Sequence, residues 1–493
     1  MCSRSLGICT FLSVAALGPA PFEGLVGLGQ AQAQNADPKS PQEKKDLDVL
    51  NSLADELIKL SSFCTANKAY SEGRAECERG LRLFDSPKLH NEIKKLAGKK
   101  DAPPKGFAQR LDVERPKALE KCALLLADMA AACSKQGRTE AFERYLRAIQ
   151  QDFPSEKALA KLDVAWFEPY RKWTSRDDAK KLEAGQERVE GKWLDPAAVE
   201  VSNRKHSTWD APWVESDGVH ELRTTVPLRT ARRLLAYITA YRAFFLQEFG
   251  GTWDLKAPSG KLPVILTETQ QALREQMKKR VGELALPSGM QGAAYYMSTN
   301  MPLNPCFVTL EPTDATGRTL KVGVDDVLRT LTHELTHQLA FEYSKHDCDP
   351  TRLTQHQFWA VEGIATFMQG HVFEKGVWRL RQPRLIPLGG NLFEQGSFTL
   401  CVEHVDRLPP LAKYMAQSQA ELMTLENYSI AATLAYFFLR GEEGAHRASF
   451  LKLLERVHKV HDTDKTFAEC FEGVDQRELD AQFRKFVEQI KLE

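Results

Sequence analysis

The pentapeptide HELTH at residues 333–337 limits the fold of this chain more than any other segment. It lies within a helical pattern, residues 325–340, that contains neither Gly nor Pro. On a helix, His333 and His337 project from the same face one turn apart, so both imidazoles can reach a single metal ion. Glu334 is then placed to contact a water molecule bound to that ion. We therefore expect this helix to follow a strand and to line a cleft.

Two histidines do not complete a catalytic zinc site, which needs three protein ligands and an open position for water. The pattern HExxHxxGxxH is excluded because this chain has Ala340 and Tyr343 where that pattern has Gly and His. Residues 358–368 instead form an apolar helical stretch with a single carboxylate, Glu362. A buried carboxylate is costly unless it is paired or binds a metal, so Glu362 is a candidate third ligand.

HELTH followed by W-x-x-E-G-x-A-T-F at residues 359–367 resembles the gluzincin clan of metallopeptidases, in particular the secreted peptidase MA-like proteins. The similarity covers roughly residues 215–490. The resemblance implies a zinc-dependent metallopeptidase that hydrolyses a peptide or protein substrate. It also implies that Zn2+ is the cofactor and that four side chains carry the chemistry: the metal ligands His333, His337 and Glu362, and the general base Glu334.

The chain departs from this family at one position. Thermolysin-like members carry an Asp four residues after the third ligand, where it orients a metal-bound histidine, but this chain has Thr366. Asp325, Asp326 and backbone carbonyls are the alternatives for that role. The resemblance also implies a Tyr or His in the C-terminal lobe that stabilises the oxyanion. Tyr428 is the candidate and His404 the alternative, while packing of Tyr428 on the core is the competing interpretation.

Two other interpretations fit the same residues. In one, the chain is a binding or scaffold protein whose N-terminal helices hold a partner, and zinc only stabilises a non-catalytic domain. Such a site would tolerate Glu334→Gln, whereas catalysis requires the carboxylate. In the other, the HExxH match arises by chance on a buried helix that binds no metal. The intact general base favours the enzyme.

Residues 1–33 have the pattern of a secretory signal peptide. Arg4 precedes the uncharged stretch 6–22, and Ala31-Gln32-Ala33 supplies a small-x-small cleavage pattern. A membrane anchor is the alternative, but prolines interrupt the apolar stretch. Beyond residue 36, no apolar run approaches the roughly 18–20 residues that a membrane-spanning helix needs. We therefore expect a secreted, periplasmic or cell-envelope protein with no transmembrane segment in its mature chain.

The charge balance excludes one class of partner. The chain has 66 Lys and Arg residues against 66 Asp and Glu residues, which gives a net charge of zero. No bulk electrostatic field would hold nucleic acid, so nucleic-acid binding is not expected. The 43% of hydrophobic residues is enough to build well-packed cores in a chain of 493 residues.

The apolar pattern divides the chain into a helical module and an α+β domain. A polar linker at residues 34–46 precedes helical periodicity over 47–190, with helical hairpins at 47–84 and 116–149. These hairpins are compatible with tetratricopeptide-like repeats and equally with an ordinary helical domain. In either case we expect the N-terminal helices to be where a protein partner binds. The gluzincin-like domain takes residues 191–493.

Within the second domain, strand patterns precede the HELTH helix and helices dominate after it. We expect a helix at 228–249 and strands at 219–226, 261–267, 292–297 and 305–310. Together they give a small mixed sheet followed by a helical C-terminal lobe. Residues 307–310 are predicted as a sheet edge that pairs with an extended peptide, with Tyr295 and Tyr296 in the same cleft.

Eight cysteines follow residue 33, none of them in a tight metal-binding spacing. Cys122 and Cys133 would lie about 16 Å apart on one helix, which is beyond disulfide reach. They either bridge to another element, such as the one that carries Cys64 or Cys77, or remain small buried thiols.

Overall fold

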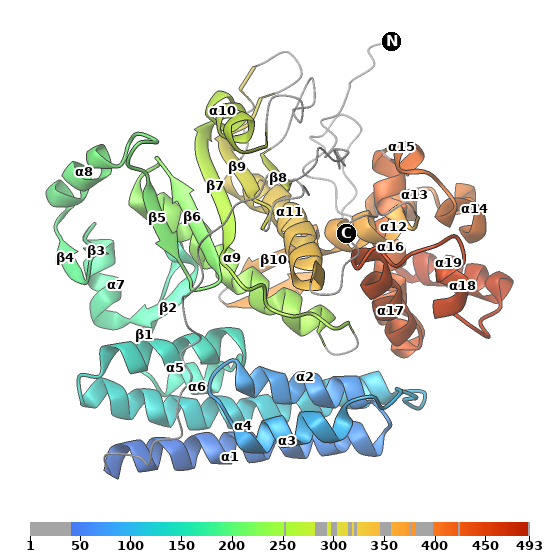
Figure 1. The fold of residues 1–493 in the computed structure, drawn as a ribbon, viewed down its shortest axis with the longest axis horizontal. Helices are drawn as coiled ribbons and strands as arrows, with labels where there is room; N and C mark the ends of the chain where they lie inside the picture. The colour runs from blue at the N-terminus through green and yellow to red at the C-terminus, as the bar shows by residue number, and fades with distance from the viewer. Residues whose placement is uncertain are drawn as a thin grey trace, which may run out of the picture. The chain divides into compact units, whose positions relative to one another are not determined.

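The computed structural model describes residues 41–250, 253–281, 293–296, 303–313, 318–319, 323–345, 356–374, 376–380, 398–422 and 424–491. It confirms the expected α+β class, because a helical N-terminal part is followed by a small mixed sheet and further helices (Figure 1). The predicted signal peptide and most of the predicted linker lie outside the described residues.

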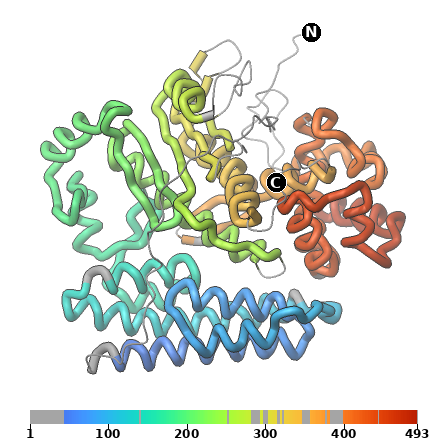
Figure 2. The backbone as a smooth tube through the Cα atoms, in the orientation of Figure 1, coloured from blue at the N-terminus to red at the C-terminus, as the bar shows by residue number. Residues whose placement is uncertain are grey.

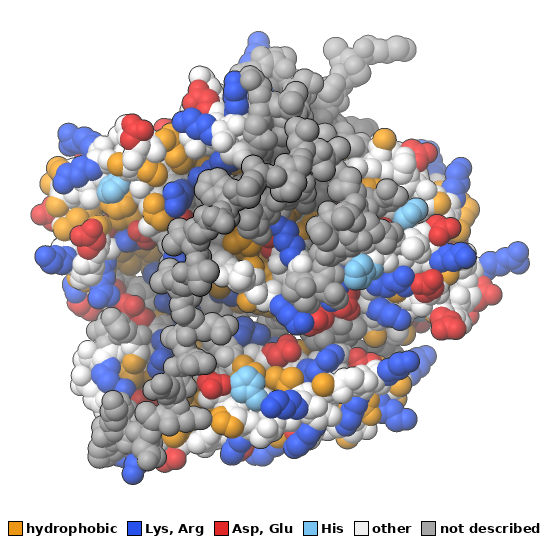
Figure 3. Space-filling model, viewed as in Figure 1, with side chains coloured by type: hydrophobic (Ala, Val, Ile, Leu, Met, Phe, Trp, Pro, Cys, Tyr) orange, Lys and Arg blue, Asp and Glu red, His pale blue; other side chains and the backbone are white. Residues whose placement is uncertain are grey.

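Helix apolarity and surface charge bear on which partners the protein can have. No helix in the described ranges combines the length and the apolarity needed to cross a membrane. On the face drawn in Figure 3, basic and acidic side chains are interspersed over the described surface. This distribution agrees with the net charge of zero.

Contacts divide the chain into two compact units, and the division falls earlier than the boundary expected at residue 190. Of the described residues, one unit comprises 41–165 and 173–176, and the other comprises 166–172 and 177–491. The segment after residue 163 forms short strands and helices: β1 (Val164–Phe167), β2 (Lys172–Ser175), α7 (Arg176–Glu183), β3 (Glu187–Val189), β4 (Lys192–Leu194) and α8 (Pro196–Lys205). The strands pair as β1–β2 and β3–β4. They are too short for an alternating pattern to reveal them in the sequence.

The N-terminal unit is built from helices packed around a large apolar core and a smaller one. These are α1 (Pro41–Ala66), α2 (Tyr70–Leu81), α3 (Pro87–Leu96), α4 (Phe107–Lys135), α5 (Thr139–Gln151) and α6 (Glu156–Ala160). The two expected hairpins are present as α1–α2 and α4–α5, in the blue to teal part of Figure 2. Gly80 allows α2 to pack closely, because a Cβ there would lie 2.5 Å from Leu89 Cδ1. The tetratricopeptide interpretation of these helices stays a prediction.

A buried ionic cluster ties α2 to α4. The fully buried carboxylate of Glu76 accepts hydrogen bonds from Arg79 Nε at 2.9 Å and Arg115 Nε at 2.5 Å. Arg115 also pairs with Glu72 at 2.6 Å. Burial alone would raise the pKa of Glu76, but the two guanidinium groups outweigh it and lower the pKa to about 2. The ionised form of Glu76 is therefore the one that links α2 to α4.

The cysteines within the described ranges are free and buried: Cys64, Cys77, Cys122, Cys133, Cys306, Cys401 and Cys470. Burial raises the pKa of the Cys77 and Cys122 thiols to about 12. Of the two expectations for Cys122 and Cys133, the structure confirms buried thiols. Cys348 lies outside the described residues.

The second unit is centred on a five-stranded sheet with the order β5-β6-β7-β9-β8 (Figure 1). Its strands are β5 (Trp213–Ser216), β6 (His220–Thr224), β7 (Leu262–Thr269), β8 (Ala294–Tyr296) and β9 (Cys306–Glu311). β6, β7 and β9 run parallel, and β5 and β8 pair antiparallel with their neighbours. The expectation of a sheet edge at residues 307–310 is wrong, because β9 lies between β7 and β8. Among the described strands, β8 is the outermost on that side.

The two faces of this sheet are covered by different helices. These are α9 (Leu228–Phe249), α10 (Gln270–Val281) and α11 (Val324–Ser344). Successive strand residues point to opposite faces. Val264 and Tyr296 join the core formed with α9 and α11, whereas Ile265 and Tyr295 pack with residues of α10. Of the two tyrosines expected in one cleft, only Tyr296 therefore lies on the side of the HELTH helix.

The helices after α11 form the C-terminal lobe. They are α12 (Phe358–Gln369), α13 (Thr399–Glu403), α14 (Leu411–Met415), α15 (Gln419–Leu422), α16 (Leu425–Arg440), α17 (Arg447–His458), α18 (Thr466–Cys470) and α19 (Gln476–Gln489). A short antiparallel hairpin, β10 (His371–Glu374) and β11 (Val377–Leu380), follows α12, and no sequence pattern predicted it. Stacked aromatic rings, such as Trp359 on Phe450, hold the lobe together. The Gly/Pro-rich segment 381–396 lies outside the described residues.

Candidate metal centre

The HELTH residues lie in the middle of α11, as expected. The helix begins after Gly323, whose backbone N–H donates to Asp326 Oδ2 at 3.1 Å, and Asp325 forms an ion pair with Arg171. Both acidic residues thus serve the first turn of the helix, where negative charge is favoured, rather than the histidines. Residues 330–344 are buried without interruption, so the middle of the helix lies in the interior of the unit.

Glu362 reaches this region because α12 packs against α11 and very closely against α16. The backbones of α12 and α16 approach each other closely at Gly363, where a Cβ would lie 2.6 Å from the backbone oxygen of Ala431. Only glycine permits two helix backbones to meet at this distance. The neighbouring Glu362 is consequently held in the interior, with 7% of its surface exposed.

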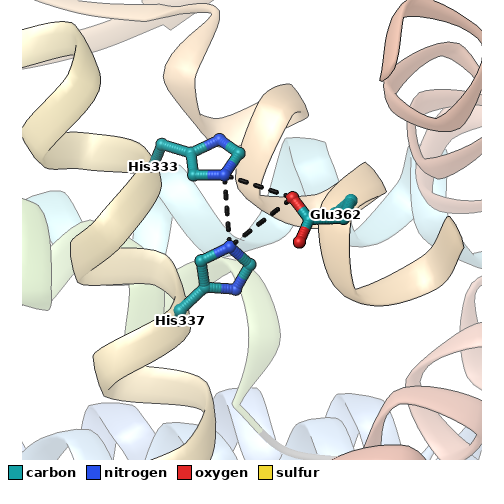
Figure 4. A group of neighbouring side chains, drawn as sticks. All are labelled: His333, His337 and Glu362. Carbon is teal, nitrogen blue, oxygen red and sulfur yellow. Dashed lines mark hydrogen bonds and ion pairs between the residues drawn. The ribbon is translucent and has the colours of Figure 1, made fainter. Parts of the chain in front are cut away.

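Three potential ligand atoms converge between the two helices (Figure 4). The Nε2 atoms of His333 and His337 are 3.1 Å apart, and Glu362 Oε2 lies 3.3 Å from the first and 3.7 Å from the second. Ligand atoms about 2.0–2.2 Å from a tetrahedral zinc ion are separated from one another by about 3.4 Å. The triangle in the structure has this size, so the group can hold a metal ion.

Glu362 is the member of this group whose charge suits a cation. The two histidines are buried, with 4% and 1% of their surfaces exposed. Burial alone would lower the pKa of His333, but the carboxylate of Glu362 raises it above its ordinary value. Burial would raise the pKa of Glu362, yet the two histidines lower it to about 2. Glu362 therefore brings a full negative charge to the centre.

Glu334 is buried next to His333, and its two oxygens have different surroundings. Oε2 accepts a hydrogen bond from the backbone N–H of Tyr296, in strand β8, at 2.7 Å. Oε1 is buried, and no hydrogen-bond partner for it occurs among the described residues. A buried carboxylate oxygen without a partner is costly and points to a small polar molecule or a proton that it receives. Oε2 is thus held by a hydrogen bond to the sheet, whereas Oε1 can still accept a hydrogen bond or a proton.

Strand β8 is held to α11 through a second acidic residue. Glu342 lies about two turns beyond Glu334 on the same helix face. Its Oε1 accepts hydrogen bonds from the Tyr296 hydroxyl at 2.9 Å, the backbone N–H of Asn304 at 3.0 Å and the Asn304 side chain at 2.8 Å. Tyr296 therefore contacts α11 twice, and this fixes the strand that carries the partner of Glu334.

The partner of His333 is a residue that sequence reasoning missed. Its Nδ1 lies 3.1 Å from Oε1 of Gln369, the last residue of α12. The expected partners were Asp325, Asp326 and backbone carbonyls. The only signal for Gln369 in the sequence is its position two helical turns after Glu362. Such a spacing does not distinguish it from a glutamine on the protein surface.

Of the two candidates for the oxyanion donor, the structure brings Tyr428 to the centre. The ring centroids of Tyr428 and His333 are 6.3 Å apart. Tyr428 is half-buried in the first turn of α16, a helix capped by the Thr424 hydroxyl, which accepts the Asn427 N–H at 3.2 Å. His404 instead pairs with Glu426, with Nδ1 and Oε1 3.1 Å apart.

No model of a known protein family matches this chain, and no curated protein matches it either. The resemblance to gluzincins thus rests on the residues of α11 and α12.

Proposed function

We propose that this chain is a zinc-dependent metallopeptidase of the gluzincin type. The observation that carries the proposal is the convergence of three ligand atoms, from His333, His337 and Glu362, with the buried carboxylate of Glu334 next to them on α11. A structural zinc site is closed by four protein ligands, whereas a catalytic site has three and keeps one position open. The group found among the described residues has three members, which supports a catalytic role.

Zinc is the metal that this set of side chains favours. Two imidazoles and one carboxylate form a common ligand set of zinc hydrolases, and all three groups suit a borderline-soft ion. When bound, zinc supplies Lewis-acid chemistry: it lowers the pKa of water towards neutrality and polarises a carbonyl group. The single negative charge of Glu362 leaves the complex cationic, which favours this chemistry.

The proposed task of Glu334 is to accept a proton and return it. Because Oε2 is hydrogen-bonded to strand β8, Oε1 is the atom that takes the proton from water as the water attacks an amide carbonyl. The same oxygen then gives the proton to the leaving amine. The backbone hydrogen bond from Tyr296 keeps the carboxylate in one orientation through both transfers.

We propose that an extended peptide or protein substrate lies along the outer side of β8. Thr309 N–H donates to Ala293 O at 2.7 Å in the pairing with β9, so the backbone N–H and C=O of Ala294 point away from β9, whereas the N–H of Tyr296 on the same side donates to Glu334. Backbone hydrogen bonds to such a strand hold a peptide without demanding a particular sequence. Tyr428 would donate a hydrogen bond to the oxyanion.

The signal-peptide pattern of residues 1–33 supports export, and we propose that the enzyme acts in a secreted, periplasmic or cell-envelope setting. The N-terminal helical unit has a core of its own, which supports a separate role for it. Binding of a protein partner is the role we propose.

Cleavage of a peptide library by residues 34–493, with and without a zinc chelator, tests the proposed function. The wild type should cleave, and Glu334→Gln should hold zinc equally well but lose about 10²–10⁴-fold in rate. A Glu334→Gln variant that cleaves as fast as the wild type would contradict the role of Glu334. A zinc-loaded wild type that cleaves no peptide would instead favour a non-catalytic binding or scaffold protein.

A further inference from the structure

His333 has partners at both of its ring nitrogens. Its Nε2 faces His337 Nε2 and Glu362 Oε2 (Figure 4), and its Nδ1 lies 3.1 Å from Gln369 Oε1. Gln369 and Glu362 belong to the same helix, α12. One helix therefore supplies a metal ligand and also the partner of another ligand.

The contact with Gln369 decides which nitrogen of His333 carries a proton. An amide oxygen only accepts hydrogen bonds, so the proton in this contact must be on His333 Nδ1. A neutral imidazole with a proton on Nδ1 has its lone pair on Nε2, which is the nitrogen that faces the other two ligand atoms. Gln369 thus selects the tautomer that a metal ion requires.

Helix geometry explains why Gln369 can take this place although Thr366 stands at the position of the family's Asp. Side chains on an α-helix tilt towards its N-terminus, so a residue covers the surface of the turn before it. Thr366 has a short branched side chain, whereas the longer side chain of Gln369, from the last turn of α12, extends back to His333.

We infer that Gln369 is a positioning residue, which orients His333 and thereby sets how tightly the chain holds Zn2+. The inference rests on the proposed zinc site and adds a property of this chain, since a neutral amide takes the place of a carboxylate. A carboxylate that accepts the hydrogen bond from Nδ1 raises the basicity of the imidazole more than an amide oxygen does, and a more basic imidazole is a stronger metal ligand. The affinity for Zn2+ should therefore increase from Gln369→Ala through the wild type to Gln369→Glu.

The affinity of residues 34–493 for Zn2+ itself, measured by competition with a chromophoric chelator, tests this inference. Loss of an outer partner costs about 10–100-fold in metal affinity, so Gln369→Ala should bind Zn2+ about 10–100-fold more weakly than the wild type. Gln369→Glu should bind at least as tightly as the wild type, because its carboxylate oxygen accepts the same hydrogen bond. A purely structural role would not produce this rescue.

Gln482→Ala is the matched control. It removes a contact of the same kind and length, since His446 Nε2 lies 3.1 Å from Gln482 Oε1 away from the metal centre. Its affinity for Zn2+ should equal that of the wild type. Equal affinities for the wild type, Gln369→Ala and Gln482→Ala would overturn the inference but leave the zinc site standing. A wild type that binds no Zn2+ would overturn the proposed function and the inference together.

Discussion

Replacing Gly363 by Ala should loosen the packing of α12 and weaken the metal centre. The added Cβ would lie 2.6 Å from the backbone oxygen of Ala431 and 3.1 Å from its carbonyl carbon. Ordinary van der Waals contact begins near 3.4 Å, so the two helices would have to separate by about 0.8 Å at this point. Both atoms belong to the backbone of α16, and neither can rotate away as a flexible side chain does.

The expected loss of folding stability is the difference between two opposing contributions. Overpacking of a tight contact costs about 1–3 kcal/mol, and a contact between two backbones belongs at the upper end. Ala is favoured over Gly within a helix by about 1 kcal/mol, which offsets part of this cost. We therefore expect the free energy of unfolding to fall by about 2 kcal/mol. Metal sites tolerate displacements of only about 0.2 Å, so a shift of the adjacent Glu362 should also lower the affinity for Zn2+ at least about tenfold.

Urea unfolding followed by tryptophan fluorescence, together with Zn2+ competition, measures both effects. Gly323→Ala is a suitable control, because the nearest atom to its added Cβ is 3.5 Å away. If Gly363→Ala unfolds at the same urea concentration as the wild type and binds Zn2+ equally well, the argument from close helix packing is refuted.

Three further substitutions probe other parts of the chain. Glu76→Gln should destabilise the N-terminal unit by about 3 kcal/mol at neutral pH. The pKa of Glu76 falls from 4.5 to about 2 on folding. The ionised carboxylate therefore contributes fully to the free energy of unfolding above pH 4.5, and this contribution is lost on acidification. The difference from the wild type should therefore shrink by about 2 kcal/mol at pH 3 in urea titrations, and a constant difference would contradict this. Glu342→Ala leaves the hydrogen-bond donors of Asn304 and the Tyr296 hydroxyl without their acceptor, so the free energy of unfolding should fall by about 2–4 kcal/mol in the same assay. A stability equal to that of the wild type would argue against this contact. Tyr428→Phe should keep its zinc but lose about 10²–10³-fold in peptide cleavage, and unchanged cleavage would exclude it as the oxyanion donor.

Long periodic segments were predictable from the sequence. The helix expected at residues 228–249 is α9, and the expected strands correspond to β6, β7, β8 and β9. The helix is long enough for its apolar residues to show a helical period, whereas the strands were recognised as short runs of apolar and β-branched or aromatic residues. The order of the strands was not predictable, because the place of β9 between β7 and β8 depends on pairing between segments far apart in the chain. The short hairpin β10–β11 was not predicted.

The candidate metal ligands could be found in the sequence, but the residues that support them could not. The spacing of His333 and His337 fixes their common helix face, and Glu362 stands out as a carboxylate in an apolar stretch. Gln369 and Glu342 are polar residues near the ends of helices, where a solvated side chain is the ordinary expectation. Only the packing of α11, α12 and the sheet shows that they face other polar groups.

Elemental mass spectrometry of purified residues 34–493, beside the Glu362→Ala variant, tests the metal centre itself. The ligand set predicts about one zinc ion per wild-type chain and a marked loss in the variant. A wild type that holds no zinc after zinc is added back, or a Glu362→Ala variant that holds as much as the wild type, would contradict the proposed centre.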